Sequence, residues 1–251
     1  MKFNLTDYLS TLDNQVFGKQ ILYIPETKST NDDIWNHFVD NDHLIVVTDK
    51  QTAGRGQRGN KWVSKEYQSL TFSIGLLDDK KNSDLLSLKC AIAISNAIKK
   101  ITGISVSTKW PNDILIKNKK ISGILIESKV NNNRRILNIG IGINVNFDID
   151  DVDTDLKDKM TSLKIEARQD FSRELILSEC IKSIDSLLYK NNQFIITEWT
   201  KLCAHNNSEL TFHDFNNKII KGKFMGVDKK GRAIILSNGE TNYYFNGAIK
   251  L

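Results

Sequence analysis

Residues 51–62, Gln-Thr-Ala-Gly-Arg-Gly-Gln-Arg-Gly-Asn-Lys-Trp, combine residue types that suit anion binding. Three glycines alternate with Arg55 and Arg58, and Lys61 and Trp62 follow them. A guanidinium group offers paired N–H donors that match two oxygens of a carboxylate or phosphate, and glycine lets the backbone approach a ligand closely. We therefore predict a mobile lid over a phosphate; the alternative is a basic surface turn between two strands.

A second cluster, Ser29-Thr30-Asn31, follows an apolar run at 21–24 and precedes a predicted helix that ends near Val39. Free N–H groups at a helix start, together with side-chain hydroxyls, can bind a carboxylate or the polar edge of a ligand. Simple N-capping of the helix is the alternative.

A third cluster, Lys-Trp-Pro-Asn-Asp at 109–113, interrupts two short predicted strands within 105–116. Pro111 is one of two prolines in the chain, and it fixes the backbone beside Lys109. A tight turn alone does not require a lysine at this position. We therefore count Lys109 among the candidate site residues.

Glycines also occur inside two predicted strands. Gly123 lies within 120–127, and Gly140 and Gly142 lie within 135–146. Glycine weakens a strand, so its presence indicates a bulge or a place where a ligand or another backbone segment comes close.

The remaining pattern supplies the elements that must position these clusters. Apolar runs predict further strands at 44–47 and 69–77. Helical periodicity predicts helices at 84–101, 171–189 and 194–203, and Asn118-Lys119 is expected at a hairpin tip. The chain thus mixes strands and helices, and the family resemblance given below implies that they form an α+β fold.

Two later segments differ from this pattern. The stretch 147–161 is acidic and poor in large apolar residues, which predicts a mobile surface loop; it lacks the glycine and terminal glutamate of an EF-hand. From 208 onward, short alternating runs separated by turns predict four or five strands and a small β-barrel. We therefore predict two domains, 1–205 and 206–251.

The composition is that of an ordinary globular protein. The chain has 251 residues, 40% of them hydrophobic, and a net charge of +5 without a polybasic tail. This balance suits an anionic small molecule or an acidic protein partner and requires neither nucleic acid nor membrane. Three separated cysteines predict free thiols in a reducing compartment, so we expect a cytoplasmic protein with no metal site built from cysteines.

Taken together, Ser29-Thr30-Asn31, the loop 54–62, Lys109 to Asp113, and the glycine strands at 120–125 and 140–146 closely resemble the biotin protein ligases. The resemblance covers roughly residues 21–146 and extends to the C-terminal β-segment. It implies a catalytic domain with a mixed β-sheet flanked by helices, related to class II aminoacyl-tRNA synthetases, and an SH3-like C-terminal barrel.

The resemblance also implies a two-step reaction. Biotin and ATP, with Mg²⁺, would give biotinyl-5'-AMP and pyrophosphate. The biotinyl group would then pass to a lysine of a biotin carboxyl carrier protein domain, in acetyl-CoA carboxylase or another biotin-dependent carboxylase.

The site residues follow from the resemblance position by position. Those expected to bind biotin are Ser29, Thr30, Asn31, Gln51, Arg55, Gly56, Gln57, Lys109 and Gly123. Those expected to bind ATP are Arg55, Arg58, Lys61, Lys109, Asn112, Lys120 and Asn144, with Lys109, Arg55 and Arg58 as the catalytic group. Trp62 is expected to be a packing anchor at the end of the loop.

Two departures from the family pattern matter. Many relatives carry arginine where this chain has Gln57, which bears on how tightly the reactive adenylate is retained. Some relatives carry an N-terminal helix-turn-helix domain, but only about twenty residues precede the first predicted strand here, so we expect no DNA binding. Exposed sheet edges in such folds can pair, which leaves a homodimer open.

Two other functions are considered. A lipoate-protein ligase shares the fold and an adenylate intermediate, but we expect a different glycine-loop pattern in that family. A non-catalytic RNA-binding module could use a basic loop and a small barrel, yet the aromatic residues are not interleaved with the basic ones.

Overall fold

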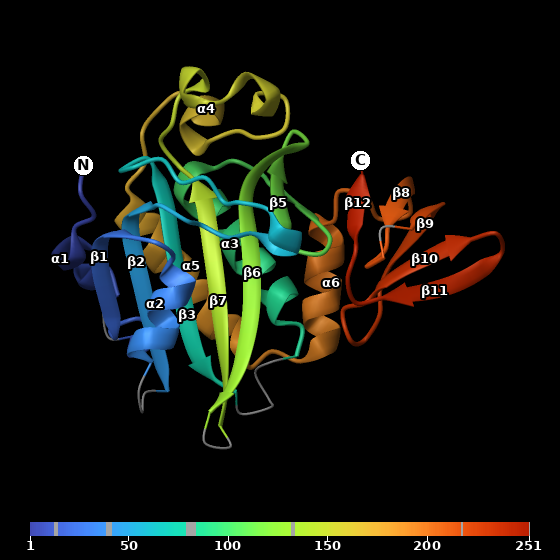
Figure 1. Ribbon diagram of the computed structural model, residues 1–251, viewed down its shortest axis with the longest axis horizontal. Coiled ribbons are helices and arrows are strands. Elements are labelled where there is room, and N and C mark those ends of the chain that lie inside the picture. Colours follow the sequence, from blue (N-terminus) through green and yellow to red (C-terminus); the bar gives the residue numbers. More distant parts are fainter. Residues whose placement is uncertain (13–14, 39–41, 79–83, 132–133, 217, 251) are drawn as a thin grey trace.

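A seven-stranded mixed sheet forms the larger part of the computed structural model (Figure 1), which describes residues 1–12, 15–38, 42–78, 84–131, 134–216 and 218–250. The strands are β1 (Ile21–Thr27), β2 (His43–Gln51), β3 (Ser69–Leu77), β4 (Ser107–Lys109), β5 (Asp113–Ile116), β6 (Lys119–Asn131) and β7 (Arg134–Asn144). Their order across the sheet is β1-β2-β3-β7-β6-β5-β4. Only β1 and β2 pair in parallel among the described strands, so the predicted mixed sheet is confirmed.

Helices cover both faces of this sheet. The helices of this part are α1 (Leu5–Ser10), α2 (Thr30–His37), α3 (Leu86–Thr102), α4 (Leu163–Ala167), α5 (Arg173–Leu188) and α6 (Asn192–Leu202). In Figure 1, α2 lies in front of the sheet, and α3 and α5 lie behind it. The predicted end of α2 at Val39 falls outside the described residues.

The alternation of β3 explains this arrangement. Leu70, Phe72 and Ile74 are buried in the main core with α3 and α5. The intervening side chains, which include Thr71 and Ser73, therefore face α2. A strand that is apolar on one face and polar on the other thus separates the core from the candidate site.

The C-terminal part is an open sheet. Its strands are β8 (Glu209–His213), β9 (Ile219–Val227), β10 (Ala233–Ser237), β11 (Glu240–Tyr244) and β12 (Ala248–Lys250), in the order β11-β10-β9-β8-β12. The predicted number of strands is confirmed. The prediction of a closed barrel is wrong, because in the described residues β11 and β12 are edge strands that do not pair with each other.

The C-terminal sheet packs against the part of the chain that carries the Lys109 cluster. The indole Nε1 of Trp110 donates to the Gly231 carbonyl at 3.1 Å, and its ring lies 5.9 Å from that of Phe212. Trp110 is 2% exposed, so the tryptophan of the third cluster joins the two sheets.

The acidic segment has more structure than predicted. It contains two 3₁₀ turns, η2 (Ile149–Asp151) and η3 (Thr154–Leu156), and Phe147 and Val152 are buried. A β-bridge joins Lys120 to Met160. The hairpin tip also differs by one residue, since Lys117 and Asn118 carry the positive φ angles of 48° and 66° and β6 begins at Lys119.

No helix in the described residues has the length and apolar character needed to cross a membrane.

A buried ion pair links strand β2 of the large sheet to helix α5. The guanidinium of Arg173 lies 2.7 Å from Oδ1 of Asp49, and the two side chains are 4% and 1% exposed. Asp49 also accepts from the Phe3 N–H at 3.1 Å and from the Tyr23 hydroxyl, which helps to raise the pKa of Tyr23 to about 12 after the larger effect of burial. Arg173 further donates to the Met1 carbonyl at 2.7 Å.

We expect the substitution Arg173→Met to lower the free energy of unfolding by about 3–5 kcal/mol, because it leaves the Asp49 carboxylate buried without a counter-charge. Urea unfolding followed by circular dichroism measures the change. The matched control is Lys50→Met, which removes an exposed ion pair with Glu26 and should have a much smaller effect. Equal losses in the two variants would contradict the prediction.

Candidate active site

The glycine loop covers an outer cleft with a volume of about 1150 Å³. The cleft is bounded by the loop, by Asp32 of α2, by Leu125 to Glu127 of β6, and by Phe215 and Asn246 of the C-terminal sheet. Beneath the loop lies an inner cavity of about 40 Å³, which shares Arg55 and Gly56 among its lining residues with the cleft. The two hollows therefore form one site.

Most of the predicted site residues come together here. The inner cavity is lined by Ser29, Thr30, Asn31, Gln51, Arg55, Gly56, Gln57, Asn112, Lys120 and Gly123. Arg58 and Lys61 line the outer cleft. Lys109 and Asn144 line neither hollow.

A hydrogen-bond network of uncharged side chains, linked at one end to the carboxylate of Glu127, forms the floor of the inner cavity. Thr30 donates to Gln51 Oε1 from its N–H at 2.8 Å and from its hydroxyl at 3.1 Å. The hydroxyls of Thr30 and Ser73 lie 2.7 Å apart, and Ser73 donates to Asn31 Oδ1 at 2.6 Å. Asn31 Nδ2 in turn donates to Glu127 at 3.0 Å. This network holds donors and acceptors in fixed positions around a small space.

Ser73 and Glu127 are site residues that the sequence analysis missed. A signal existed for Ser73, because hydroxyl side chains recur at every second position of the otherwise apolar strand Ser69–Leu77. Glu127 gave no such signal, since a glutamate at a strand end is ordinary on a protein surface.

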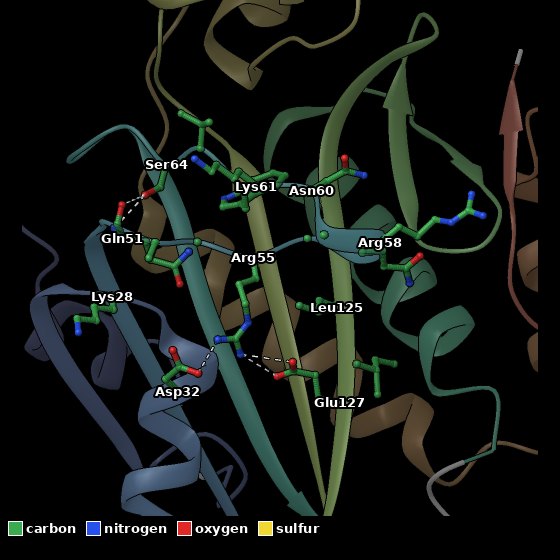
Figure 2. Close-up of a pocket in the computed structure, with 18 of the residues that line it drawn as sticks. Lys28, Asp32, Gln51, Arg55, Arg58, Asn60, Lys61, Ser64, Leu125 and Glu127 are labelled. Atoms are coloured by element: carbon green, nitrogen blue, oxygen red, sulfur yellow. Dashed lines mark hydrogen bonds and ion pairs between the residues drawn. The ribbon is translucent and has the colours of Figure 1, made fainter. Parts of the chain in front are cut away.

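The loop cation Arg55 is held by two carboxylates, as Figure 2 shows. Its guanidinium lies 2.6 Å from Asp32 Oδ1 and 3.2 Å from Glu127 Oε2. Arg58 extends in another direction and donates to the Asp214 carbonyl of the C-terminal sheet at 2.5 Å. The two arginines of the loop thus face different partners.

The loop folds back on itself as a small hairpin. Arg55 and Lys61 form a β-bridge, the Gly56 N–H donates to the Asn60 carbonyl at 2.7 Å, and the 3₁₀ turn η1 (Gln57–Gly59) makes the tip. At Gly54 a Cβ would lie 2.5 Å from the Trp62 carbonyl, so this position requires glycine. Movement of the loop remains a prediction.

Protein side chains occupy the space above the strand glycines. A Cβ at Gly142 would lie 2.2 Å from Cε2 of Trp62, and one at Gly140 would lie 2.3 Å from Oδ1 of Asn31. Trp62 lines both hollows, so it is more than the packing anchor predicted at the end of the loop. Its buried indole N–H has no hydrogen-bond partner in the described part of the chain.

Lys109 lies at the end of β4 and lines neither hollow. It is half-buried, and burial lowers the pKa of its ammonium; the nearby Asp113 carboxylate opposes this effect and the Lys120 ammonium adds to it. Lys120 itself pairs with Asp113 at 2.5 Å.

Burial, assisted by the charge of Lys109, lowers the pKa of the buried His205 to about 4, so this imidazole is neutral at pH 7.

The two asparagines predicted to bind ATP are held by backbone groups. Asn112 Nδ2 donates to the Ile124 carbonyl at 2.7 Å, and Asn144 Nδ2 donates to the Thr161 carbonyl at 3.0 Å. Oδ1 of Asn144 is buried and accepts no hydrogen bond from the described residues. Asn144 is 1% exposed and lines neither hollow, so its role in binding ATP stays a prediction.

Within the described ranges, no group of three His, Cys, Asp or Glu side chains is arranged to hold a metal ion. The geometry instead suits an organic ligand with an uncharged polar end, held on the floor, and an anionic end, held by the cations of the loop and of β6.

Comparison with known proteins assigns residues 22–146 to the biotin/lipoate A/B protein ligase family. The "Bifunctional ligase/repressor BirA" of Bacillus subtilis is 31% identical over 96% of this chain and 76% of its own length. The protein of the same name from Escherichia coli is 25% identical over 94% of this chain and 75% of its own length. A biotin protein ligase from Aquifex aeolicus, solved with biotin and ATP, superimposes with a TM-score of 0.79 at 30% identity, over 92% of this chain and 98% of its own.

We expect Gly142→Ala to displace Trp62 and release the loop, since the added methyl group would overlap the indole. Limited trypsin digestion checks this: cleavage after Arg55, Arg58 and Lys61 should become several-fold faster. In a Trp62→Ala background, where the overlap is absent, Gly142→Ala should have no further effect. An unchanged cleavage rate in the single variant would contradict the proposed packing.

Proposed function

We propose that this chain, which belongs to the biotin/lipoate A/B protein ligase family and is an ATP-dependent biotin ligase, makes biotinyl-5'-AMP from biotin and ATP. In a second step it transfers the biotinyl group to a lysine of a biotin carboxyl carrier protein domain. The observation that carries the proposal is the juxtaposition of the uncharged floor with the cationic loop. Each half suits one end of a biotin molecule that is about to react with ATP.

The floor suits the ureido group of biotin. That group presents N–H donors and a carbonyl acceptor without a net charge, and the floor offers hydroxyl and amide groups of Ser29, Thr30, Asn31 and Gln51. A site whose polar groups are fixed in advance loses little entropy on binding. It also rejects molecules that leave its buried groups without partners.

The cations suit the other half of the reaction. A carboxylate oxygen of biotin attacks the α-phosphorus of ATP; a new O–P bond forms, the bond to the bridging oxygen breaks, and pyrophosphate leaves with that electron pair. Two anions must come together in this step, so fixed positive charge lowers the barrier. Arg55, Arg58, Lys61 and Lys120 line the site and can supply this charge. Lys109 lies close enough to Lys120 for the two charges to interact, and we propose that it contributes as well.

Arg55 can leave its protein partners at little cost. Its side chain is 40% exposed, and those of Asp32 and Glu127 are 46% and 32% exposed. Ion pairs between partly exposed side chains contribute little to stability. A carboxylate or phosphate in the cavity can therefore compete for the guanidinium. This exchange would bring the loop onto the ligand.

In the second step the neutral amine of the carrier lysine attacks the acyl carbon. A C–N bond forms, the bond from the acyl carbon to the phosphate oxygen breaks, AMP leaves with that electron pair, and the amine nitrogen loses a proton to solvent. Positive charge near the phosphate stabilises the leaving group, so the same cations serve both steps. Asn112 and Asn144 are the proposed contacts of the nucleotide.

Mg²⁺ would enter with ATP and neutralise part of the phosphate charge. Within the described ranges, no group of three His, Cys, Asp or Glu side chains is arranged to hold a metal ion. Because Mg²⁺ commonly keeps several waters and binds substrate phosphates, we propose that the ion would rest on phosphate oxygens and water. Cys90 and Cys180 are buried free thiols, as expected for the reducing, cytoplasmic location that we propose.

Mass spectrometry of a carrier domain after incubation with this protein, MgATP and biotin tests the function. We expect the mass of one biotinyl group on one lysine, and no product when lipoate replaces biotin. A carrier that stays unmodified would overturn the proposal, and modification by lipoate alone would assign the other branch of the family.

We expect Lys109→Ala to slow adenylate formation at least 100-fold, since an aligned charge is worth about 3 kcal/mol or more. Biotin-dependent ATP–pyrophosphate exchange measures this rate. Because burial lowers the pKa of Lys109, the wild-type rate should fall on the alkaline side at a lower pH than for an ordinary lysine. The arginine in Lys109→Arg stays charged at alkaline pH, so the fall in rate at high pH should disappear in this variant. If the fall persists unchanged, it is caused by the titration of another group.

We expect Gln57→Arg to slow release of biotinyl-5'-AMP, because a charge-assisted hydrogen bond is worth about 1.5–3 kcal/mol against about 1 for a neutral one. Labelled biotin, MgATP and albumin as a bystander protein measure release and stray labelling side by side. Arg55 and Arg58 flank the position and can compensate, so the effect should stay below the full difference. Equal labelling by both proteins would exclude a role for position 57.

A further inference from the structure

We propose that Thr71 and the indole N–H of Trp62 bind the carboxylate of biotin, beside the ammonium of Lys120. This assignment rests on the proposed function and adds two binding groups to it. Both residues line the inner cavity.

The first observation is an unmet hydrogen-bonding capacity. Thr71 is 4% exposed, and neither its hydroxyl oxygen nor the buried indole Nε1 of Trp62 has a hydrogen-bond partner among the described residues. Buried polar groups in folded proteins are almost always hydrogen-bonded, and those without a partner call for an explanation. Two such groups in one small cavity indicate a ligand atom that binds both.

The second observation is the register of the sheet. Thr71 of β3 is directly opposite Gly142 of β7, and Gly142 is directly opposite Gly123 of β6. The indole Nε1 of Trp62 lies 2.5 Å from the Cβ position of Gly142, and Nζ of Lys120 lies 3.1 Å from that of Gly123. Opposed Cβ positions are about 4.5–5.5 Å apart, so the hydroxyl, the indole N–H and the ammonium form one row across the sheet.

The third observation is the neighbouring row. Two positions along β3, Ser73 is opposite Gly140, above which lies Asn31 of the uncharged floor. Residues two apart in a strand are separated by about 6.6–6.8 Å. A row with only uncharged groups therefore lies one strand repeat away from a row with a cation and two further donors. This spacing suits a short molecule with a neutral head and a carboxylate tail.

The donor row is also oriented toward the nucleotide side of the site. Ser69, two positions beyond Thr71, is opposite Asn144, the proposed nucleotide contact. A carboxylate held by Thr71, Trp62 and Lys120 would thus lie between the floor and the place proposed for ATP. Thr71 and Trp62 would orient the attacking oxygen, and Lys120 would offset its charge.

Titration calorimetry with biotin alone tests the assignment without any catalytic step. Thr71→Val, which keeps the shape and removes the hydroxyl, should weaken biotin binding about 10-fold, equivalent to about 1.4 kcal/mol. Thr71→Ser keeps the hydroxyl and should stay within about threefold, while Trp62→Phe should weaken binding to a degree similar to Thr71→Val. The double variant should lose less than the two single losses combined, since both groups bind the same carboxylate.

The thermal stability of the ligand-free protein gives a second readout. Thr71→Val removes a buried hydroxyl that has no partner, so the unfolding temperature should rise, by about 2–4 °C. Thr108→Val is the matched control: Thr108 is 1% exposed, its hydroxyl also lacks a partner in the described chain, and it lines neither hollow. It should raise the unfolding temperature without changing biotin binding.

Biotinol, in which an alcohol replaces the carboxylate while the ureido group and the ring sulfur are kept, identifies the group that is bound. Thr71→Val should weaken the binding of biotin much more than that of biotinol. An equal loss for both ligands would overturn the carboxylate assignment, and a Thr71→Val affinity for biotin within threefold of wild type would overturn the role of Thr71. If the wild-type protein does not bind biotin, the proposed function itself is wrong.

Discussion

The site depends on one steric constraint: strand β7 lacks side chains where it crosses the face that carries α2. Without a Cβ at Gly140 and Gly142, Asn31 and Trp62 can lie directly on the strand. These two contacts fix the helix start and the end of the glycine loop relative to the sheet. The floor network and the loop are positioned through them, because the network includes Asn31 and the loop hairpin ends at Trp62.

The balance of charge in the unliganded site follows from the same packing. Holding the loop against the sheet brings Arg55 to Asp32 and Glu127, and Glu127 also accepts from Asn31. A single carboxylate thus touches both the floor and the loop. If the loop moves as predicted, occupation of the floor and movement of the loop would therefore be coupled through Glu127, since either event would change the partners of its oxygens.

Much of this arrangement could be predicted from residue patterns. The apolar runs identified the strands of the large sheet, and helical periodicity placed α3 within two residues of its observed bounds, because burial follows local alternation closely. The grouping of Ser29, Gln51 and Gly123 around one cavity came from a family resemblance. No local rule brings together residues so far apart in sequence.

What could not be predicted depends on register and on long-range contacts. The glycines of β7 signalled that something comes close, but only the paired strands show that this is Trp62 and Asn31 rather than a ligand alone. Thr71 is an ordinary strand residue until its hydroxyl is found buried without a partner. The open C-terminal sheet differs from the expected barrel because strand count does not determine closure, which depends on pairing between the two edge strands, here β11 and β12.

The contact between the loop and the C-terminal sheet has a consequence for molecular evolution. Arg58 donates to the main-chain carbonyl of Asp214, and every amino acid provides such a carbonyl. Position 214 can therefore drift in sequence while this link persists, so correlated substitutions between the two positions need not arise. Related proteins could thus keep the hydrogen bond between the loop and the C-terminal sheet as long as the backbone keeps its course at position 214. Comparison of their side chains at that position would not reveal the contact.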